Sequence, residues 1–257
     1  MMLNKIIRVV RDAGEMIRCA HDIADDITEK SSHIDVVTKY DTAVQEFLHR
    51  ELLKLMPQAG FLGEEGAHDE ITSEWTFIVD PIDGTANFVR NFGHSNISVA
   101  LAKNGVSEYG VVYNPFRDEL FAAQRGKGAT LNGRPIRVSD ADASHAIVLC
   151  GSTAYDRELT DRHFAMMRAL YDRTGDFRRL GAAALDLCYL AAGRGEVFFE
   201  CRLRPWDIAA GSLVLTEAGG KVTQLDGTPL NVLQNCSVFA ANEACYGLIE
   251  VIQDFLA

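Results

Sequence analysis

Residues 78–88 read Ile78-Val79-Asp80-Pro81-Ile82-Asp83-Gly84-Thr85-Ala86-Asn87-Phe88, and this stretch bears most directly on the fold and the chemistry. An apolar, strand-like run ends in Asp80, and Asp83 follows three residues later. Pro81 fixes φ and removes a backbone donor, so we expect a tight turn that directs both carboxylates and the Ile82 carbonyl at one point. Two carboxylates at the end of an apolar strand would repel each other without a cation, and Mg²⁺ prefers oxygen ligands of this kind. The stretch therefore predicts a metal site.

The residues around these aspartates extend the prediction to a phosphate site. Gly84 and Thr85 begin what reads as a helical turn, and the free N–H groups at a helix start suit a phosphate. A second acidic motif, Gly63-Glu64-Glu65-Gly66, is also compatible with a solvated acidic turn. The third acidic motif contains Asp207, which lies near the start of a predicted helix. An aspartate at that place is also compatible with a purely structural role as a helix cap.

Taken together, the three motifs resemble the inositol monophosphatase family of metal-dependent phosphatases. The broader group includes the fructose-1,6-bisphosphatases and the 3′-phosphoadenosine nucleotidases. The resemblance covers almost the whole chain, because further matching text precedes and follows the motifs. The matching text is Val36-Val37-Thr38-x-x-Asp41, Gly63-Glu64-Glu65, Asp80-Pro81-Ile82-Asp83-Gly84-Thr85-x-Asn87-Phe88, Trp206-Asp207-x-Ala209-Ala210-Gly211 and Glu217-Ala218-Gly219-Gly220.

The resemblance implies a role for each of these polar residues. Two or three Mg²⁺ ions are expected, and the implied ligands are Glu64, Asp80, the Ile82 carbonyl, Asp83 and Asp207. The implied catalytic residues are Asp41 and Thr85, which orient the attacking water, and Glu65, which shapes the surroundings of the metal. Lys30 is expected to favour the metal-bound state by its charge.

The resemblance also implies where the substrate binds. The backbone N–H groups of Gly84 and Thr85 would hold phosphate oxygens. The substrate's alcohol side would be lined by Gly181, Ala182, Ala183, Glu200 and Asp207. For Glu200, an alternative is a surface carboxylate paired with Arg202 or Arg204.

The remaining pattern predicts an α/β protein. Apolar residues recur at helical spacing near the start of the chain and again before Pro57. The middle third reads as short strands separated by turns, and the last part alternates strands and helices. With the resemblance, this predicts an alternating α-β-α-β-α sandwich of the sugar-phosphatase type. We expect an N-terminal, mainly antiparallel α+β subdomain over residues 1–140 that carries most metal ligands, and a smaller α/β subdomain over residues 141–257 that supplies Asp207 and the substrate side.

Composition limits the classes of partner. The 257 residues include 25 Lys and Arg against 36 Asp and Glu, which gives a formal charge of −11. A chain this acidic is not expected to bind nucleic acid or anionic membranes non-specifically. No apolar run is long enough for a membrane span, and charged residues such as Lys5 and Arg8 argue against a signal peptide. Six cysteines without a Cys-x-x-Cys pair suggest reduced thiols in a cytoplasmic protein.

These observations predict a Mg²⁺-dependent phosphomonoesterase that hydrolyses a small sugar or polyol phosphate by in-line attack of a metal-activated water. The resemblance favours inositol monophosphate as the substrate. Fructose-1,6-bisphosphatase or histidinol-phosphatase activity is an alternative, and so is a regulatory, partner-binding protein that retains the phosphatase fold. The resemblance further implies inhibition by lithium and a homodimer.

Overall fold

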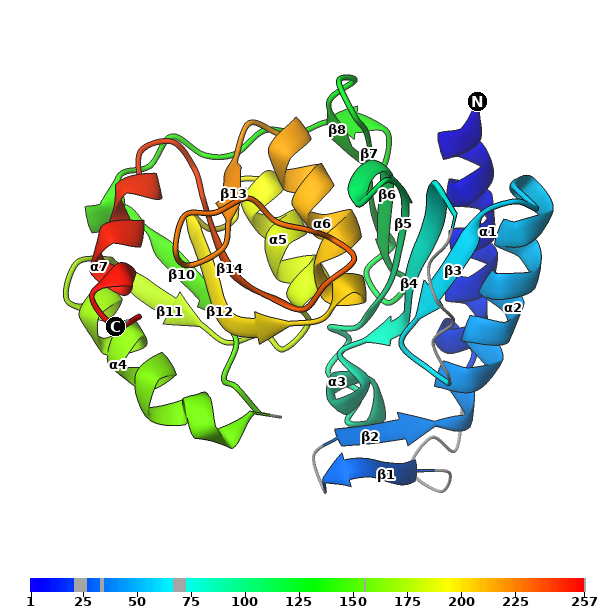
Figure 1. Cartoon of the computed structure of the whole chain (residues 1–257), viewed down its shortest axis with the longest axis horizontal. Helices are drawn as coiled ribbons and strands as arrows, with labels where there is room; N and C mark the ends of the chain where they lie inside the picture. The colour runs from blue at the N-terminus through cyan, green and yellow to red at the C-terminus, as the bar shows by residue number, and fades with distance from the viewer. Residues whose placement is uncertain (21–26, 33–34, 67–72, 155, 257) are drawn as a thin grey trace.

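Helices and sheets alternate in layers across the molecule (Figure 1). The computed structural model describes residues 1–20, 27–32, 35–66, 73–154 and 156–256. Its helices are α1 (Met2–Arg18), α2 (Lys39–Leu55), α3 (Thr85–Val89), α4 (Thr160–Tyr171), α5 (Ala183–Ala191), α6 (Pro205–Glu217) and α7 (Ile249–Gln253). The α1 and α2 helices form one outer layer, α5 and α6 lie in the centre, and α4 and α7 form the other outer layer. A sheet lies between each pair of helical layers, so the predicted α-β-α-β-α sandwich is confirmed.

The larger sheet has seven strands in the order β3-β4-β5-β6-β7-β8-β9. Only β3 and β4 pair in parallel, and every other neighbouring pair is antiparallel. This confirms the expected mainly antiparallel sheet. Its strands are β3 (Gly60–Gly63), β4 (Trp75–Asp83), β5 (Asn96–Lys103), β6 (Val106–Asn114), β7 (Glu119–Gln124), β8 (Ala129–Leu131) and β9 (Arg134–Pro135).

The smaller sheet has five strands in the order β11-β10-β12-β14-β13. The β10 strand pairs in parallel with β11 and β12, whereas β14 runs antiparallel to β12 and β13. Its strands are β10 (Ile147–Cys150), β11 (Asp176–Arg178), β12 (Val197–Leu203), β13 (Lys221–Thr223) and β14 (Cys236–Ala241). A separate hairpin is formed by β1 (Ile27–Ser32) and β2 (Asp35–Thr38).

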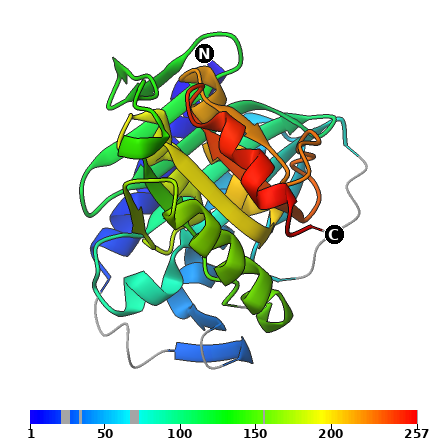
Figure 2. The same cartoon turned by 90° about the vertical axis from the view of Figure 1, so that its left-hand side faces the viewer.

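Three apolar clusters hold the layers together. The outer face of the larger sheet packs on α1 and α2 through residues such as Val10, Leu48 and Phe77. The central cluster joins α5 and α6 to both sheets, and these two helices are buried along most of their length, as expected for helices that are apolar on all sides. A third cluster packs α4 and α7 on the smaller sheet (Figure 2). Because both sheets share the central cluster, the subdomain boundary near residue 140 stays a prediction.

The chain ends in a short 3₁₀ segment, Tyr246–Leu248, followed by α7. The β12 strand, which carries Glu200, continues to Leu203. All six cysteines are free thiols, and no helix among the described residues is long and apolar enough to cross a membrane.

Candidate active site

A bulge in β4 brings Asp80 and Asp83 to the same side of the sheet. The strand continues through Pro81 to Asp83, so the predicted tight turn is wrong. Asp80 lies opposite Ser98 and Asp83 opposite Asn96, so two residues of β4 face a single residue of β5 between these pairs. Side chains three residues apart on a regular strand point to opposite faces. The extra residue of a bulge cancels that alternation, which explains how the two carboxylates converge.

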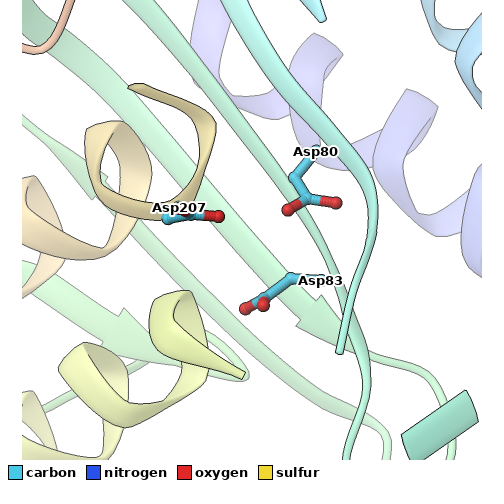
Figure 3. Close-up of side chains that lie close together, drawn as sticks. All are labelled: Asp80, Asp83 and Asp207. Carbon is cyan, nitrogen blue, oxygen red and sulfur yellow. The ribbon is translucent and has the colours of Figure 1, made fainter. Parts of the chain in front are cut away.

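The third aspartate, Asp207, comes from the first turn of α6. One of its carboxylate oxygens accepts a hydrogen bond of 2.7 Å from the backbone N–H of Arg204, so it does cap the helix. One oxygen of each of Asp80, Asp83 and Asp207 lies within 4.8 Å of the others. Figure 3 shows the three side chains pointing toward one another from β4 and α6. The capping role and the cluster are therefore compatible in one residue.

The fourth predicted carboxylate ligand, Glu64, directly follows β3. Its backbone N–H donates to the Val79 carbonyl at 3.1 Å, which places Glu64 beside the end of β4. Its carboxyl is in hydrogen-bond contact with that of Asp80. Glu64 and Ile82 line the same cavity as the three aspartates, so the structure brings all the predicted metal ligands together.

Burial and mutual repulsion raise the pKa of each aspartate in this cluster. Burial is the main cause in all three, and neighbouring carboxylates raise the pKa of Asp80 and Asp207 further. Asp80 and Asp83 are only 2% and 7% exposed. Asp83 is partly compensated, since it accepts hydrogen bonds from the Asn96 amide at 2.7 Å and from the Ala184 N–H of α5 at 2.9 Å. A divalent cation would reverse the repulsion, and this all-oxygen set has the chemistry that Mg²⁺ prefers.

Gly84 lies between this cluster and α3, and Thr85 is the first residue of that helix. Gly84 has a φ of +83°, and a Cβ there would lie 3.1 Å from the backbone oxygens of both His94 and Gly181, so the turn requires glycine. The Thr85 hydroxyl lies 3.1 Å from an Asp41 carboxylate oxygen and 3.0 Å from the Ile82 carbonyl. The expected pairing of Thr85 with Asp41 is therefore present.

Asp41 is held from the opposite side by Thr38. The other Asp41 carboxylate oxygen accepts hydrogen bonds from both the Thr38 N–H at 2.7 Å and the Thr38 hydroxyl at 2.6 Å. Burial raises the pKa of Asp41 in spite of these bonds. The neighbouring charge of Glu65 raises it too, and the Glu65 N–H donates to Gln45 at 2.9 Å. Thr85 lines the cavity, whereas its partner Asp41 and the neighbouring Glu65 do not.

A cavity of about 790 Å³ extends from the carboxylate cluster to the smaller sheet, and its wall contains the predicted substrate residues Gly181, Ala182, Ala183 and Glu200. This volume is within the range of ligand pockets, ~300–1,000 Å³. The Ala183 N–H, like that of Ala184, also stabilises the charged form of Asp83. Ala183 therefore contacts the carboxylate cluster as well as the cavity.

Glu200 is anchored by the loop that follows β10. Its carboxylate accepts a hydrogen bond of 3.2 Å from the Thr153 N–H and lies directly over Gly151, where a Cβ would be 1.4 Å from a Glu200 oxygen. Burial raises the pKa of Glu200 to about 7. Arg202 instead pairs with Asp156 at 2.6 Å. Within the described residues Glu200 forms no ion pair with Arg202 or Arg204, so the surface ion-pair alternative is wrong.

Several residues that support the site were not predicted. Asn96 and the start of α5 stabilise Asp83, and Asn87 donates to the backbone oxygens of His94 and Leu180 at 2.9 and 2.8 Å. Asn87 belongs to the quoted motif, but its partners are distant in sequence. Arg179 and Asp186 line the cavity and carried no local signal. The side chain of Lys30 lies outside the described residues.

Comparison with known proteins agrees with this site. The inositol monophosphatase family profile matches residues 2–255, so the chain belongs to the inositol monophosphatase family. It is 39% identical to the Nus factor SuhB of Pasteurella multocida over an alignment of 259 positions, which covers 100% of this chain and 97% of that protein. The solved IMPase of Thermotoga maritima has a TM-score of 0.87 and 32% identity, with 97% of this chain and 96% of that chain covered. A structure described as an IMPase/NADP phosphatase complexed with Mg²⁺ and phosphate has a TM-score of 0.84 and 26% identity, with 98% and 96% covered.

Proposed function

We propose that this protein is a Mg²⁺-dependent phosphomonoesterase that acts on a small sugar or polyol phosphate. The observation that carries the proposal is the convergence of Asp80, Asp83 and Asp207 beside the Gly84-Thr85 turn, at one end of a cavity large enough for a sugar phosphate. The similar structure that contains Mg²⁺ and phosphate supports the same assignment.

The residues that would hold Mg²⁺ are Glu64, Asp80, Asp83 and Asp207, with the Ile82 carbonyl as a further oxygen ligand. When bound there, Mg²⁺ would offset the repulsion between these carboxylates and a phosphate ester, and would lower the pKa of a bound water. The expected number of ions, two or three, stays a prediction.

The chain's own groups then bind and orient the reactants. The backbone N–H groups of Gly84 and Thr85 would hold phosphate oxygens. The Thr85 hydroxyl, by donating its proton to Asp41, keeps an oxygen lone pair that can accept a proton from the attacking water. Asp41 is suited to take up that proton, because burial raises the pKa of its carboxyl toward the range useful to a general base. Glu200 and the turn at Gly181 would contact the alcohol.

A phosphate-release assay tests this proposal. Inositol 1-phosphate, fructose 1,6-bisphosphate and histidinol phosphate are each supplied with Mg²⁺, and then with excess chelator. We expect turnover of at least one ester with Mg²⁺ and none with chelator. Undiminished turnover in chelator, or no turnover of any ester, would contradict the proposal. Lithium inhibition, implied by the resemblance, is tested in the same assay by comparing LiCl with KCl.

A second role is favoured by the relatives. The Pasteurella multocida protein is named a Nus factor rather than a phosphatase. This supports the regulatory, partner-binding alternative more directly than it supports inositol monophosphate as the substrate. We therefore propose that the chain also acts by binding a macromolecular partner, as a Nus factor, on the phosphatase fold. Its homodimeric state and its expected lack of nucleic-acid binding stay predictions.

The two roles can be separated by complementation. The chain and its Asp83→Asn variant would be expressed in a bacterium from which its own Nus factor SuhB has been deleted. Restoration of growth by both would show a role that does not need catalysis. Restoration by the active chain alone would assign the function to hydrolysis, and failure of both would contradict the regulatory proposal.

A further inference from the structure

The wall of the cavity contains a guanidinium, that of Arg179, for which the described residues supply no ion-pair partner. Arg179 directly follows β11, is exposed, and lines the cavity. Among the described residues, no carboxylate oxygen lies within 4.0 Å of it. Arg202, which lines the same cavity, is by contrast paired with Asp156 and Glu158 at 2.6 and 3.3 Å.

The backbone fixes Arg179 relative to the metal ligands. Asn87, on α3, donates to the carbonyl oxygens of Leu180 and Gly181 at 2.8 and 3.4 Å. A few residues later, the Ala184 N–H donates to Asp83. The segment that presents Arg179 is thus tied at two points to the part of the chain that would bind the transferred phosphate.

The side chain of Arg179 lies over the turn that follows it. Gly181 has a φ of +86°, and a Cβ there would be 2.3 Å from an Arg179 guanidinium nitrogen. A Cβ at this position would displace the guanidinium, and the positive φ also favours glycine there. Glycine at position 181 therefore leaves room for the Arg179 guanidinium beside the turn.

The carboxyls nearest to Arg179 do not neutralise it fully. Asp186 and Glu200 are both close enough for Arg179 to lower their pKa values, but burial outweighs this effect. The pKa of Glu200 is raised to about 7, and that of Asp186 is raised well above its usual value. This wall therefore combines a permanent cation with a Glu200 carboxyl that is partly protonated near neutral pH.

We propose that Arg179 binds a second anionic group, a phosphate or a carboxylate, on the alcohol portion of the substrate. Guanidinium pairs with both groups in a bidentate manner. The preferred esters would then carry two separate anionic groups, which favours a bisphosphate such as fructose 1,6-bisphosphate over inositol monophosphate. This inference rests on the proposed phosphatase function and specifies its substrate class.

Two matched substrate pairs test the proposal. Fructose 1,6-bisphosphate and fructose 1-phosphate differ in a distal phosphate. 2-Phosphoglycerate and glycerol 2-phosphate differ in a carboxylate. For each pair, kcat/KM for release of the shared phosphate is measured with Mg²⁺ for the unaltered protein, Arg179→Ala, Arg179→Lys and Arg178→Ala. Arg178 is the control, because it is paired with Asp176 at 2.6 Å and does not line the cavity.

The unaltered protein should prefer the doubly anionic member of at least one pair. Arg179→Ala should reduce that preference about 10- to 150-fold, the loss expected for a charged hydrogen bond. The loss should appear mainly in KM and leave the singly anionic substrate within about threefold. Arg179→Lys should give an intermediate value, and Arg178→Ala should change neither substrate. The pair that responds identifies the anion as phosphate or carboxylate.

A second measurement reports binding without turnover. Fructose 6-phosphate carries only the distal phosphate, and it should raise the Tm of the unaltered protein more than that of Arg179→Ala. An unchanged preference in both pairs, or equal losses on singly and doubly anionic substrates, would show that Arg179 only balances Glu200 and Asp186, and would overturn the proposal. If no ester is hydrolysed at all, the proposed phosphatase function fails, and this inference fails with it.

Discussion

The two ends of the cavity are built in different ways. At the metal end, carboxylates from the end of β4 and the start of α6 converge. Hydrogen bonds from Asn96 and the Ala184 N–H to Asp83, and from the Arg204 N–H to Asp207, offset part of their repulsion. At the opposite wall, Glu200 is held by the loop after β10, and Arg179 lies on a glycine turn. The metal end would act on every phosphate ester in the same way, whereas the wall can distinguish one alcohol from another. Changes at the metal end should therefore affect all substrates, and changes at the wall only some.

The largest effect should follow from Asp83→Asn. Loss of one carboxylate from the cluster should reduce phosphate release about 10³-fold or more for every substrate, because Mg²⁺ supplies several kcal/mol of transition-state stabilisation. The fold should persist, since an amide oxygen can still accept a hydrogen bond from α5. Asp118→Asn, at an exposed carboxylate that pairs with Arg11, is the control. If Asp83→Asn lowered the rate for one substrate only, the metal end would not act on all esters in the same way, and the contrast between the two ends would be wrong.

A change at Thr85 should have the next largest effect. Thr85→Ala removes the hydroxyl that lies 3.1 Å from Asp41, and it should slow all substrates about 10²-fold, the lower end of the range for general acid–base catalysis. Thr85→Ser keeps the hydroxyl and should recover most of the rate. Similar rates for the alanine and serine variants would mean that the hydroxyl does not take part.

Glu200→Gln should distinguish most clearly between substrate recognition at the wall and chemistry at the metal end. It should lower kcat/KM about 10- to 150-fold for a polyol phosphate that hydrogen-bonds to this carboxyl. Hydrolysis of p-nitrophenyl phosphate, which has no polyol, should stay within about threefold, and the Mg²⁺ dependence should be unchanged. Equal losses on the two substrates would place Glu200 in support of the metal site or the fold.

The smallest effect concerns stability. The pKa of Glu200 is about 7 in the folded protein against a usual 4.5. Its contribution to the free energy of unfolding is therefore fully present below pH 4.5 and is lost as the pH rises through about 7. At about 1.36 kcal/mol per pKa unit, this difference in pKa corresponds to at most about 3 kcal/mol in the free energy of unfolding.

Urea unfolding in chelator at pH 5 and pH 8.5 measures this contribution. Relative to the unaltered protein, Glu200→Gln should be more stable at pH 8.5 than at pH 5. A difference between the two proteins that does not change with pH would contradict the account of Glu200.

The metal end was largely predictable from the sequence, because the motifs there express a local chemical need. Two carboxylates such as Asp80 and Asp83 at the end of an apolar strand would repel each other without a cation, and this prediction needs no knowledge of the rest of the fold. The geometry between them was predicted wrongly. A proline at position 81 is compatible with either a turn or a bulge. The pairing of β4 with β5 shows that the structure has a bulge.

The wall could not be predicted in the same way, because its contacts join distant segments. Thr153 reaches Glu200 across 47 positions, and Asn87 reaches Leu180 across 93. Arg178 ends β11 and Arg179 follows it, and nothing in the local sequence distinguishes the two arginines. Only the path of the chain from β11 to α5 decides that Arg179 lines the cavity while Arg178 pairs with Asp176.

Calorimetric titration with Mg²⁺ tests the central claim most directly, namely that Asp80, Asp83 and Asp207 form a metal site. Asp207→Asn is the matched variant, because the asparagine side-chain oxygen can still accept the hydrogen bond from the Arg204 N–H but the side chain lacks the charge. We predict saturable Mg²⁺ uptake by the unaltered protein at pH 8 and a large loss of affinity in Asp207→Asn, with the same thermal unfolding in chelator. No saturable uptake by the unaltered protein, or equal uptake by both, would contradict the account.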